Sequence, residues 1–138
     1  KINAKLLIIY IPAQILGCLL GVMLANVFFE HDILELSTKN RDGFNIFLSE
    51  IIATFGLIFI IFATQKDGKI TIAASVATYI MAGYWFTSST SFANPAVAIA
   101  RTFTDSFTGI NYLNTPTYIL AEFLGALIAV YFIKKLIK

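Results

Sequence analysis

The sequence predicts an all-α membrane protein with four transmembrane helices and one re-entrant half-helix. Of its 138 residues, 58% are hydrophobic and only 13% are charged, whereas a soluble domain of this size needs a charged shell. One uncharged run, residues 70–100, is too long for a single membrane span and is polar in its middle. We interpret this run as one span followed by a second helix that begins within the membrane.

The expected spans are runs with few or no charges and about 20 residues long, the length that crosses a bilayer core. They lie at about 6–29, 45–64, 70–86 and 117–133. Asp67-Gly68 indicates a tight turn between the second and third spans. Cys18, in mid-span, is interpreted as a small hydrophobic residue. His31 is interpreted as a solvated loop residue, with a pH-sensing or ligand role as the lesser alternative.

The half-helix is expected at about 95–103. Asn94 is a good N-cap and Pro95 a good first helical residue, so Asn94-Pro95-Ala96 is typical of a helix start. Because this start lies inside the uncharged run, the helix would direct its positive N-terminal end into the membrane interior. Such an arrangement indicates a pore constriction.

The distribution of basic residues predicts the orientation, because cytoplasmic loops are enriched in lysine and arginine. Most basic residues gather on one side of the expected spans, at Lys1, Lys5, Lys66, Lys69, Lys134, Lys135 and Lys138. The other side holds Lys39, Arg41 and Arg101 among five acidic residues. Both ends of the chain are therefore expected in the cytoplasm, with the half-helix entering from outside. The lysines lie at span ends and not on one face, so no nucleic-acid partner is predicted.

An internal repeat connects the first and fourth spans. The segment Tyr10-Ile-Pro-Ala-Gln14-Ile-Leu-Gly17-Cys-Leu matches Tyr118-Ile-Leu-Ala-Glu122-Phe-Leu-Gly125-Ala-Leu, with Tyr, Ile, Ala, Leu, Gly and Leu shared. The two spans are expected to run in opposite directions, which is typical of an inverted-topology repeat. A chance match between small residues in apolar helices is the alternative. If the repeat is real, two spans and a partner half-helix would precede Lys1.

Three motifs together resemble the aquaporin, or major intrinsic protein, family. They are Asn94-Pro95-Ala96 after a polar stretch, Glu50-Ile-Ile-Ala-Thr-Phe55 opening a span, and Ala13-Gln-Ile-Leu-Gly17 in the first span. The resemblance covers essentially the whole chain and corresponds to the family's third to sixth helices with its second half-helix. It implies an aquaporin-like right-handed bundle with inverted repeats, embedded in the lipid bilayer. A homotetramer of the full-length protein is also implied.

The resemblance assigns roles to several polar residues. The side-chain amide of Asn94 would face the pore and donate a hydrogen bond to a passing solute. Glu50 would be a buried acid that accepts hydrogen bonds from backbone N–H groups of the re-entrant loop, although a position near the headgroups is the alternative. Gln14 and Glu122 occupy equivalent repeat positions and would serve loop backbone in the same way.

The selectivity filter departs from the common pattern of the family. Most members carry an arginine directly after the second Asn-Pro-Ala, but this sequence has Val97 there. The other filter positions fall on Ala82 and Ser91, so the resemblance implies a wide, uncharged lining. Arg101, about one helical turn further on, is interpreted as an anchor of the outer vestibule. The stretch from Ser91 to Arg101 also resembles a bacterial subgroup associated with arsenic resistance.

The sequence therefore predicts a passive channel for small uncharged solutes: water, glycerol-like polyols and arsenite. The alternative is a non-conducting membrane protein, or a channel fragment that needs the missing N-terminal half or a partner chain. An enzyme is not expected, because no nucleophile–base pair is evident. No cofactor is expected either, and no cluster of histidine, cysteine and acidic residues suggests a metal site.

Overall fold

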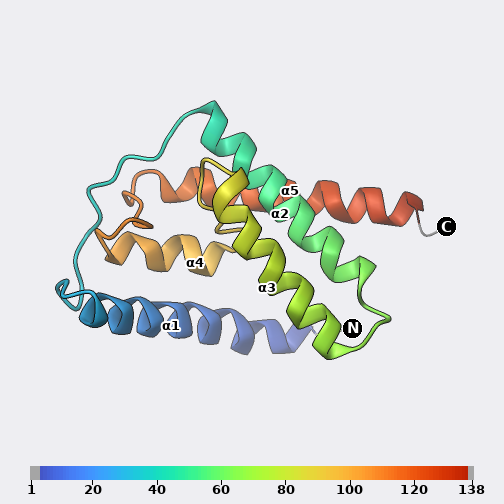
Figure 1. Ribbon diagram of the computed structural model, residues 1–138, viewed down its shortest axis with the longest axis horizontal. Coiled ribbons are helices and arrows are strands. Elements are labelled where there is room, and N and C mark those ends of the chain that lie inside the picture. The colour runs from blue at the N-terminus through green and yellow to red at the C-terminus, as the bar shows by residue number, and fades with distance from the viewer. Residues whose placement is uncertain (1–3, 137–138) are drawn as a thin grey trace. The chain divides into compact units, whose positions relative to one another are not determined.

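The computed structural model describes residues 4–136, and every regular element among them is helical. The elements are α1 (Ala4–Phe28), α2 (Phe44–Ala63), α3 (Lys69–Phe86), α4 (Pro95–Ala100), the 3₁₀ turn η1 (Arg101–Phe103) and α5 (Thr115–Leu136), and Figure 1 shows them along the chain. The expected all-α fold is confirmed. The four long helices begin and end within a few residues of the expected spans. Lys1 and Lys138, used for the orientation, lie outside the described residues.

Three of the four long helices have the length and hydropathy of a membrane span: Lys5–Phe28, Phe44–Ala63 and Thr115–Leu136. The remaining expected span, 70–86, is helical as α3 but is not among them. Its sequence includes Lys69 and several hydroxyl-bearing residues, which lower its mean hydropathy. That α3 also crosses the membrane therefore stays a prediction.

The chain divides into two compact units. The first contains the chain up to Arg41 together with Pro95–Pro116, so that α1 packs beside α4 and η1. Asn26, buried on α1, donates from its side-chain amide to the carbonyl oxygens of Phe103 (3.0 Å) and Ile33 (3.3 Å). One amide thus ties the end of α1 to η1 and to the connection that follows α1.

The second unit contains Asp42–Asn94 and the chain from Thr117 on, which includes α2, α3 and most of α5. The hydroxyl of Tyr79 on α3 donates to the carbonyl oxygen of Ala53 on α2, at 3.1 Å. On α5, Gly125 lies against α2, because a Cβ there would come within 2.5 Å of the Ile51 carbonyl oxygen. A glycine at this position lets the two backbones approach closely.

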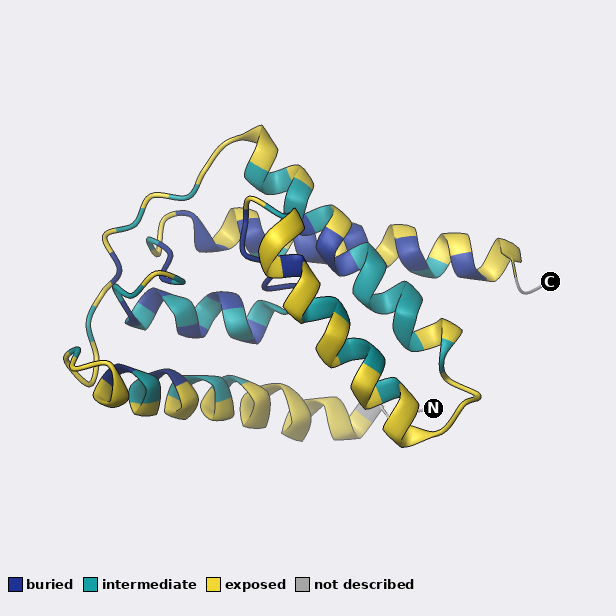
Figure 2. Ribbon diagram, in the orientation of Figure 1, coloured by how far each residue is buried: buried dark blue, intermediate teal, exposed yellow. Residues whose placement is uncertain are grey.

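The helices expose much of their apolar surface. Figure 2 shows α1 exposed along most of its length, with its buried positions near its C-terminal end. Large side chains such as Ile8, Leu20 and Phe28 are among those exposed. A soluble monomer rarely exposes a continuous apolar surface of this kind. Lipid or further protein is therefore the natural environment of these helices.

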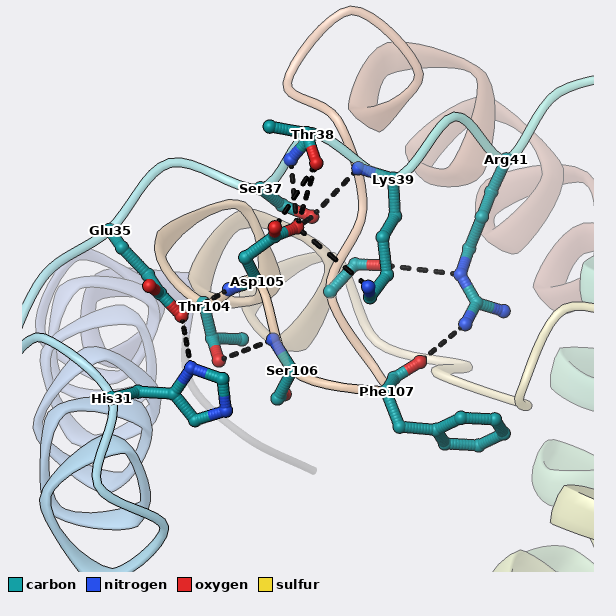
Figure 3. A network of polar contacts seen from close by, with 11 residues as sticks. His31, Glu35, Ser37, Thr38, Lys39, Arg41, Thr104, Asp105, Ser106 and Phe107 are labelled. Atoms are coloured by element: carbon teal, nitrogen blue, oxygen red, sulfur yellow. Dashed lines mark hydrogen bonds and ion pairs between the residues drawn. The ribbon is translucent and has the colours of Figure 1, made fainter.

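Reciprocal hydrogen bonds join two connections of the first unit, residues 29–41 after α1 and residues 104–114 after η1 (Figure 3). We call this set of contacts the clasp. Asp105 accepts from the Thr38 backbone N–H at 2.9 Å, and its own N–H donates to the Glu35 carboxylate at 2.9 Å. Glu35 also pairs with His31 at 2.7 Å. Arg41, at the end of connection 29–41, donates from its guanidinium to the carbonyl oxygens of Gly109 and Phe107.

This clasp predicts an acid sensitivity. The hydrogen bond from the Thr38 N–H, aided by the Thr38 hydroxyl and Lys39, lowers the pKa of Asp105. A carboxyl with a depressed pKa contributes stability above its unfolded pKa, about 3.9, which is lost as pH falls through its folded pKa. Protection of the Thr38 amide from hydrogen exchange, measured relative to the intrinsic exchange rate at each pH, should therefore fall below about pH 4. Asp105→Asn should accelerate that exchange at neutral pH, whereas Asp32→Asn, at an exposed position, should not.

Candidate functional site

The segment 87–94, which leads from α3 into α4, has an irregular and strained backbone. Three of its non-glycine residues have positive φ angles: Thr90 (72°), Ser91 (52°) and Ala93 (50°). Each such residue costs on the order of 1–3 kcal/mol and persists only where its surroundings hold it. The contacts of this segment therefore define the candidate functional site.

Glu50 on α2 binds two backbone N–H groups of this segment. Its side chain is completely buried, and its two carboxyl oxygens accept from the N–H groups of Phe92 (3.0 Å) and Ala93 (2.9 Å). The side chain of Ser89 is a further hydrogen-bond partner. A buried acid needs partners of this kind, because an unpaired charge is costly in apolar surroundings.

Glu122 on α5 holds the next residue. It is only 2% exposed, and its Oε1 accepts from the N–H of Asn94 at 3.1 Å. Its Oε2 has no hydrogen-bond partner within residues 4–136. Three successive backbone N–H groups, of residues 92 to 94, are thus bound by two carboxyl groups from different helices. The last of the three belongs to the residue that precedes α4.

Aromatic and hydroxyl groups complete the support of this segment. Tyr118, on α5 and 1% exposed, donates from its hydroxyl to the Ser89 carbonyl oxygen at 3.2 Å. Its ring lies against that of Phe92, with 5.1 Å between ring centroids. Sequence reasoning did not assign a role to Tyr118. The repeat contained the signal, because Tyr118 is the residue that aligns with Tyr10.

Ser91 packs directly on α3. A Cβ placed on Gly83 would lie 2.5 Å from the Ser91 Oγ, so this close approach requires glycine. Ser91 is buried, and its hydroxyl has no hydrogen-bond partner in the described part of the chain. Gly83 was missed by the sequence reasoning, although it directly follows the predicted filter residue Ala82. Ala82 itself is exposed on α3.

The motif residues Asn94, Pro95 and Ala96 lie at the start of α4, where Ala96 is buried and the other two are half-buried. Val97, in the next position, is also half-buried and lines a hollow of about 220 Å³ between α1 and α4. The remaining lining residues are Cys18, Gly21, Val22, Ala25, Ala100 and Arg101. That Ala82, Ser91 and Val97 form one filter stays a prediction.

Gln14, expected as a buried polar residue, is exposed on α1 within the part of the chain that the structure describes. Its role toward loop backbone stays a prediction. The buried residues of α1 are Val22 and Asn26, in the part of the helix nearest η1, and Gln14 lies outside that part. Within the described residues, Gln14 accepts no hydrogen bond from a backbone N–H group, whereas Glu122 accepts one from Asn94.

Comparison with known proteins relates the chain to one family. The family described as "Major intrinsic protein" matches residues 1–85, a region that ends before Asn94. Aquaglyceroporin AqpS of Rhizobium meliloti (strain 1021) is 45% identical over 120 residues, which cover 87% of this chain and 52% of the relative. The chain thus spans about half the length of this curated relative. No solved structure matches this chain.

The carboxyl of Glu50 provides a test of the strained segment. Glu50→Gln replaces one acceptor oxygen by an NH₂ group that would face a backbone donor, leaving a buried N–H unpaired. We expect a loss of about 1–3 kcal/mol in stability and a lower midpoint of thermal unfolding in detergent. Glu30→Gln makes the same chemical change at an exposed position and should leave the midpoint unchanged. Equal midpoints for the two variants would contradict the role of Glu50.

Proposed function

The chain belongs to the major intrinsic protein family, and from this premise we propose that it forms the pore of a passive channel for small uncharged solutes. Proteins of this family are channels and not enzymes, so the driving force is the solute gradient. The observation that carries the proposal is the binding of three successive N–H groups by Glu50 and Glu122 immediately before α4. Irregular backbone at membrane depth is tolerated where protein holds it beside a water-filled path.

In this proposal Asn94 presents its side-chain amide to the passing solute. Its backbone N–H is held by Glu122, so the residue occupies a defined position at the start of α4. The N-terminal end of a helix carries a partial positive charge, which disfavours cations in front of it. Solutes without charge exchange their water contacts for contacts with the pore lining and meet no such barrier.

The filter formed by Ala82, Ser91 and Val97 carries no charge, which favours larger neutral solutes. Water would lose hydrogen bonds at a filter without charge. A polyol would lose fewer hydrogen bonds, because it can place its carbon skeleton against the filter. The relative AqpS is named an aquaglyceroporin, which supports glycerol as a solute. We extend the proposal to water and to arsenite, a small neutral trihydroxy species.

The protein is an integral membrane protein, as its family and its three span-length helices indicate. We propose that it lies in the cell membrane of a bacterium, with both ends of this chain in the cytoplasm and a homotetrameric assembly. Since the chain spans about half of its relative, conduction requires segments equivalent to the other half. If those segments are lacking, the alternative is a non-conducting membrane protein or a fragment that needs a partner chain.

Stopped-flow light scattering on proteoliposomes tests the proposal. Vesicles that contain the full natural protein should equilibrate glycerol faster than empty vesicles of the same lipid. The same vesicles reconstituted with the Glu50→Gln variant should lose part of this flux, because the segment before α4 is no longer held. Glycerol, water and arsenite fluxes that all equal those of empty vesicles would overturn the channel function.

Val97 provides a test of the filter assignment. Val97→Arg should narrow the filter and reduce glycerol flux more than water flux, because the larger solute meets the added side chain first. Val97→Leu adds volume without charge and serves as the matched control, with a smaller effect on both fluxes. Equal losses of glycerol and water flux in the arginine variant would contradict the assignment of Val97 to the filter.

A further inference from the structure

Four lysines lie at one end of the second unit. Lys66 and Lys69 belong to the turn between α2 and α3 and to the start of α3, and Lys134 and Lys135 are in the last turn of α5. All four are exposed, and Figure 2 shows most of the turn and the last turn of α5 as exposed. One acidic residue, Asp67, lies between Lys66 and Lys69. This end of the unit therefore carries an excess of positive charge.

The contacts between α2 and α5 place the two pairs of lysines at the same end of the unit. Gly125 of α5 packs against Ile51 of α2. Further along both helices, the ring of Phe132 lies against that of Phe55, with 6.0 Å between ring centroids. Because the contacts advance in the same direction along the two helices, the C-terminal ends of α2 and α5 lie at one end. Figure 1 shows the turn after α2 and the C-terminal end of α5 on its right side.

The lysines border the apolar surface that the unit exposes. Phe62, at the end of α2, is 41% exposed, and Ile70, directly after Lys69, is 86% exposed. On α5 the exposed ring of Tyr131 precedes Lys134. In a membrane, exposed apolar side chains lie in the hydrocarbon core, and the polar headgroups begin where that core ends. A lysine that borders the apolar surface therefore lies at the depth of the lipid phosphates.

The positive charges of this end are not neutralised within the protein. Among residues 4–136, the side chains of Lys66, Lys69 and Lys134 form no ion pair and no hydrogen bond. The ammonium group of Lys135 lies over the ring of Tyr131, 5.1 Å from its centroid. Tyrosine and lysine side chains gather where a membrane meets water, so this pair is typical of the headgroup region. The ammonium groups are available to an anion outside the chain.

We infer that the basic end of the second unit, formed by Lys66, Lys69, Lys134 and Lys135, binds the phosphate groups of anionic phospholipids. Each lysine near an anionic membrane surface strengthens binding by about fivefold. An acidic protein segment would match the charge alone, whereas a lipid also covers the apolar side chains beside the lysines. A zwitterionic phospholipid has no net charge and is the weaker ligand. The inference goes beyond the channel function and does not depend on conduction.

Binding at the basic end would support α3 in the membrane. This helix is not among the three with the hydropathy of a span, so its apolar surface fixes its depth less strongly than theirs does. Lys69 is its first residue, and the turn before it is closed by a hydrogen bond from the Asp67 N–H to the Thr64 carbonyl oxygen at 3.0 Å. A phosphate bound by Lys66 and Lys69 therefore fixes the start of α3, the helix on which Ser91 packs.

Thermal unfolding of the full natural protein in detergent tests the inference, with phosphatidylglycerol or phosphatidylcholine added in equal amounts. Phosphatidylglycerol should raise the unfolding midpoint more than phosphatidylcholine does. The difference should shrink at high ionic strength, because salt screens exposed charges. This measurement needs no variant, so it tests the inference even if a substitution impairs folding.

Native mass spectrometry of the same complexes measures the contribution of single lysines. Lys66→Gln and Lys134→Gln should each lower the affinity for phosphatidylglycerol about fivefold. Lys66→Arg keeps the charge and should bind this lipid like the wild type. Lys39→Gln removes one lysine from a connection of the first unit and is the matched control, with unchanged lipid affinity.

Three outcomes would overturn the inference. They are equal midpoints with the two lipids, unchanged phosphatidylglycerol affinity in the Lys66→Gln and Lys134→Gln variants, and an equal loss of affinity in Lys39→Gln, which would indicate an effect of net charge alone. Soluble glycerol phosphate should not displace the lipid, and displacement at equal concentration would identify free phosphate as the ligand instead. Absence of glycerol flux would overturn the proposed function and leave this inference standing.

Discussion

The structure depends on the binding of three successive backbone N–H groups by two buried carboxyl groups. Residues 92 to 94 leave regular secondary structure in a protein whose helices are otherwise surrounded by apolar groups. A buried backbone N–H that is left without a partner costs about 1–3 kcal/mol. Glu50 and Glu122 supply the acceptors from α2 and α5, so two helices determine where α4 begins.

The same constraint explains the packing of the second unit. Tyr118 and Ser89 join α5 to the strained segment, and Gly83 lets Ser91 approach α3. Gly125 lets α5 approach α2, which brings the Glu122 side chain of the preceding turn toward the segment that Glu50 also holds. The polar contacts are thus possible because small residues allow close approach of the helices.

The first unit places Arg101 about one helical turn beyond Val97. Val97 and Arg101 line one hollow along α1, and the connections after α1 and after η1 are joined by the contacts of Glu35 and Asp105. These contacts use backbone and hydroxyl donors and do not involve the Arg101 guanidinium.

The sequence by itself determined the helices, the start of α4 and the family, because these follow from local signals. Hydrophobic runs set the spans, and Asn94-Pro95 marks the helix start whatever lies around it. The resemblance implied that Glu50 and Glu122 accept from loop backbone, but the sequence by itself did not distinguish Glu122 from Gln14. Gln14 and Glu122 align in the repeat, yet the structure exposes one and binds the other to the Asn94 N–H.

Only the tertiary structure decided that Ser91 packs against Gly83 and that Arg101 lines a hollow beside α1. The physical reason is that these contacts join residues from different elements, and their distances depend on how closely the helices pack. A motif reports the conformation of its own few residues, whereas burial and hydrogen-bond partners are properties of the packed chain.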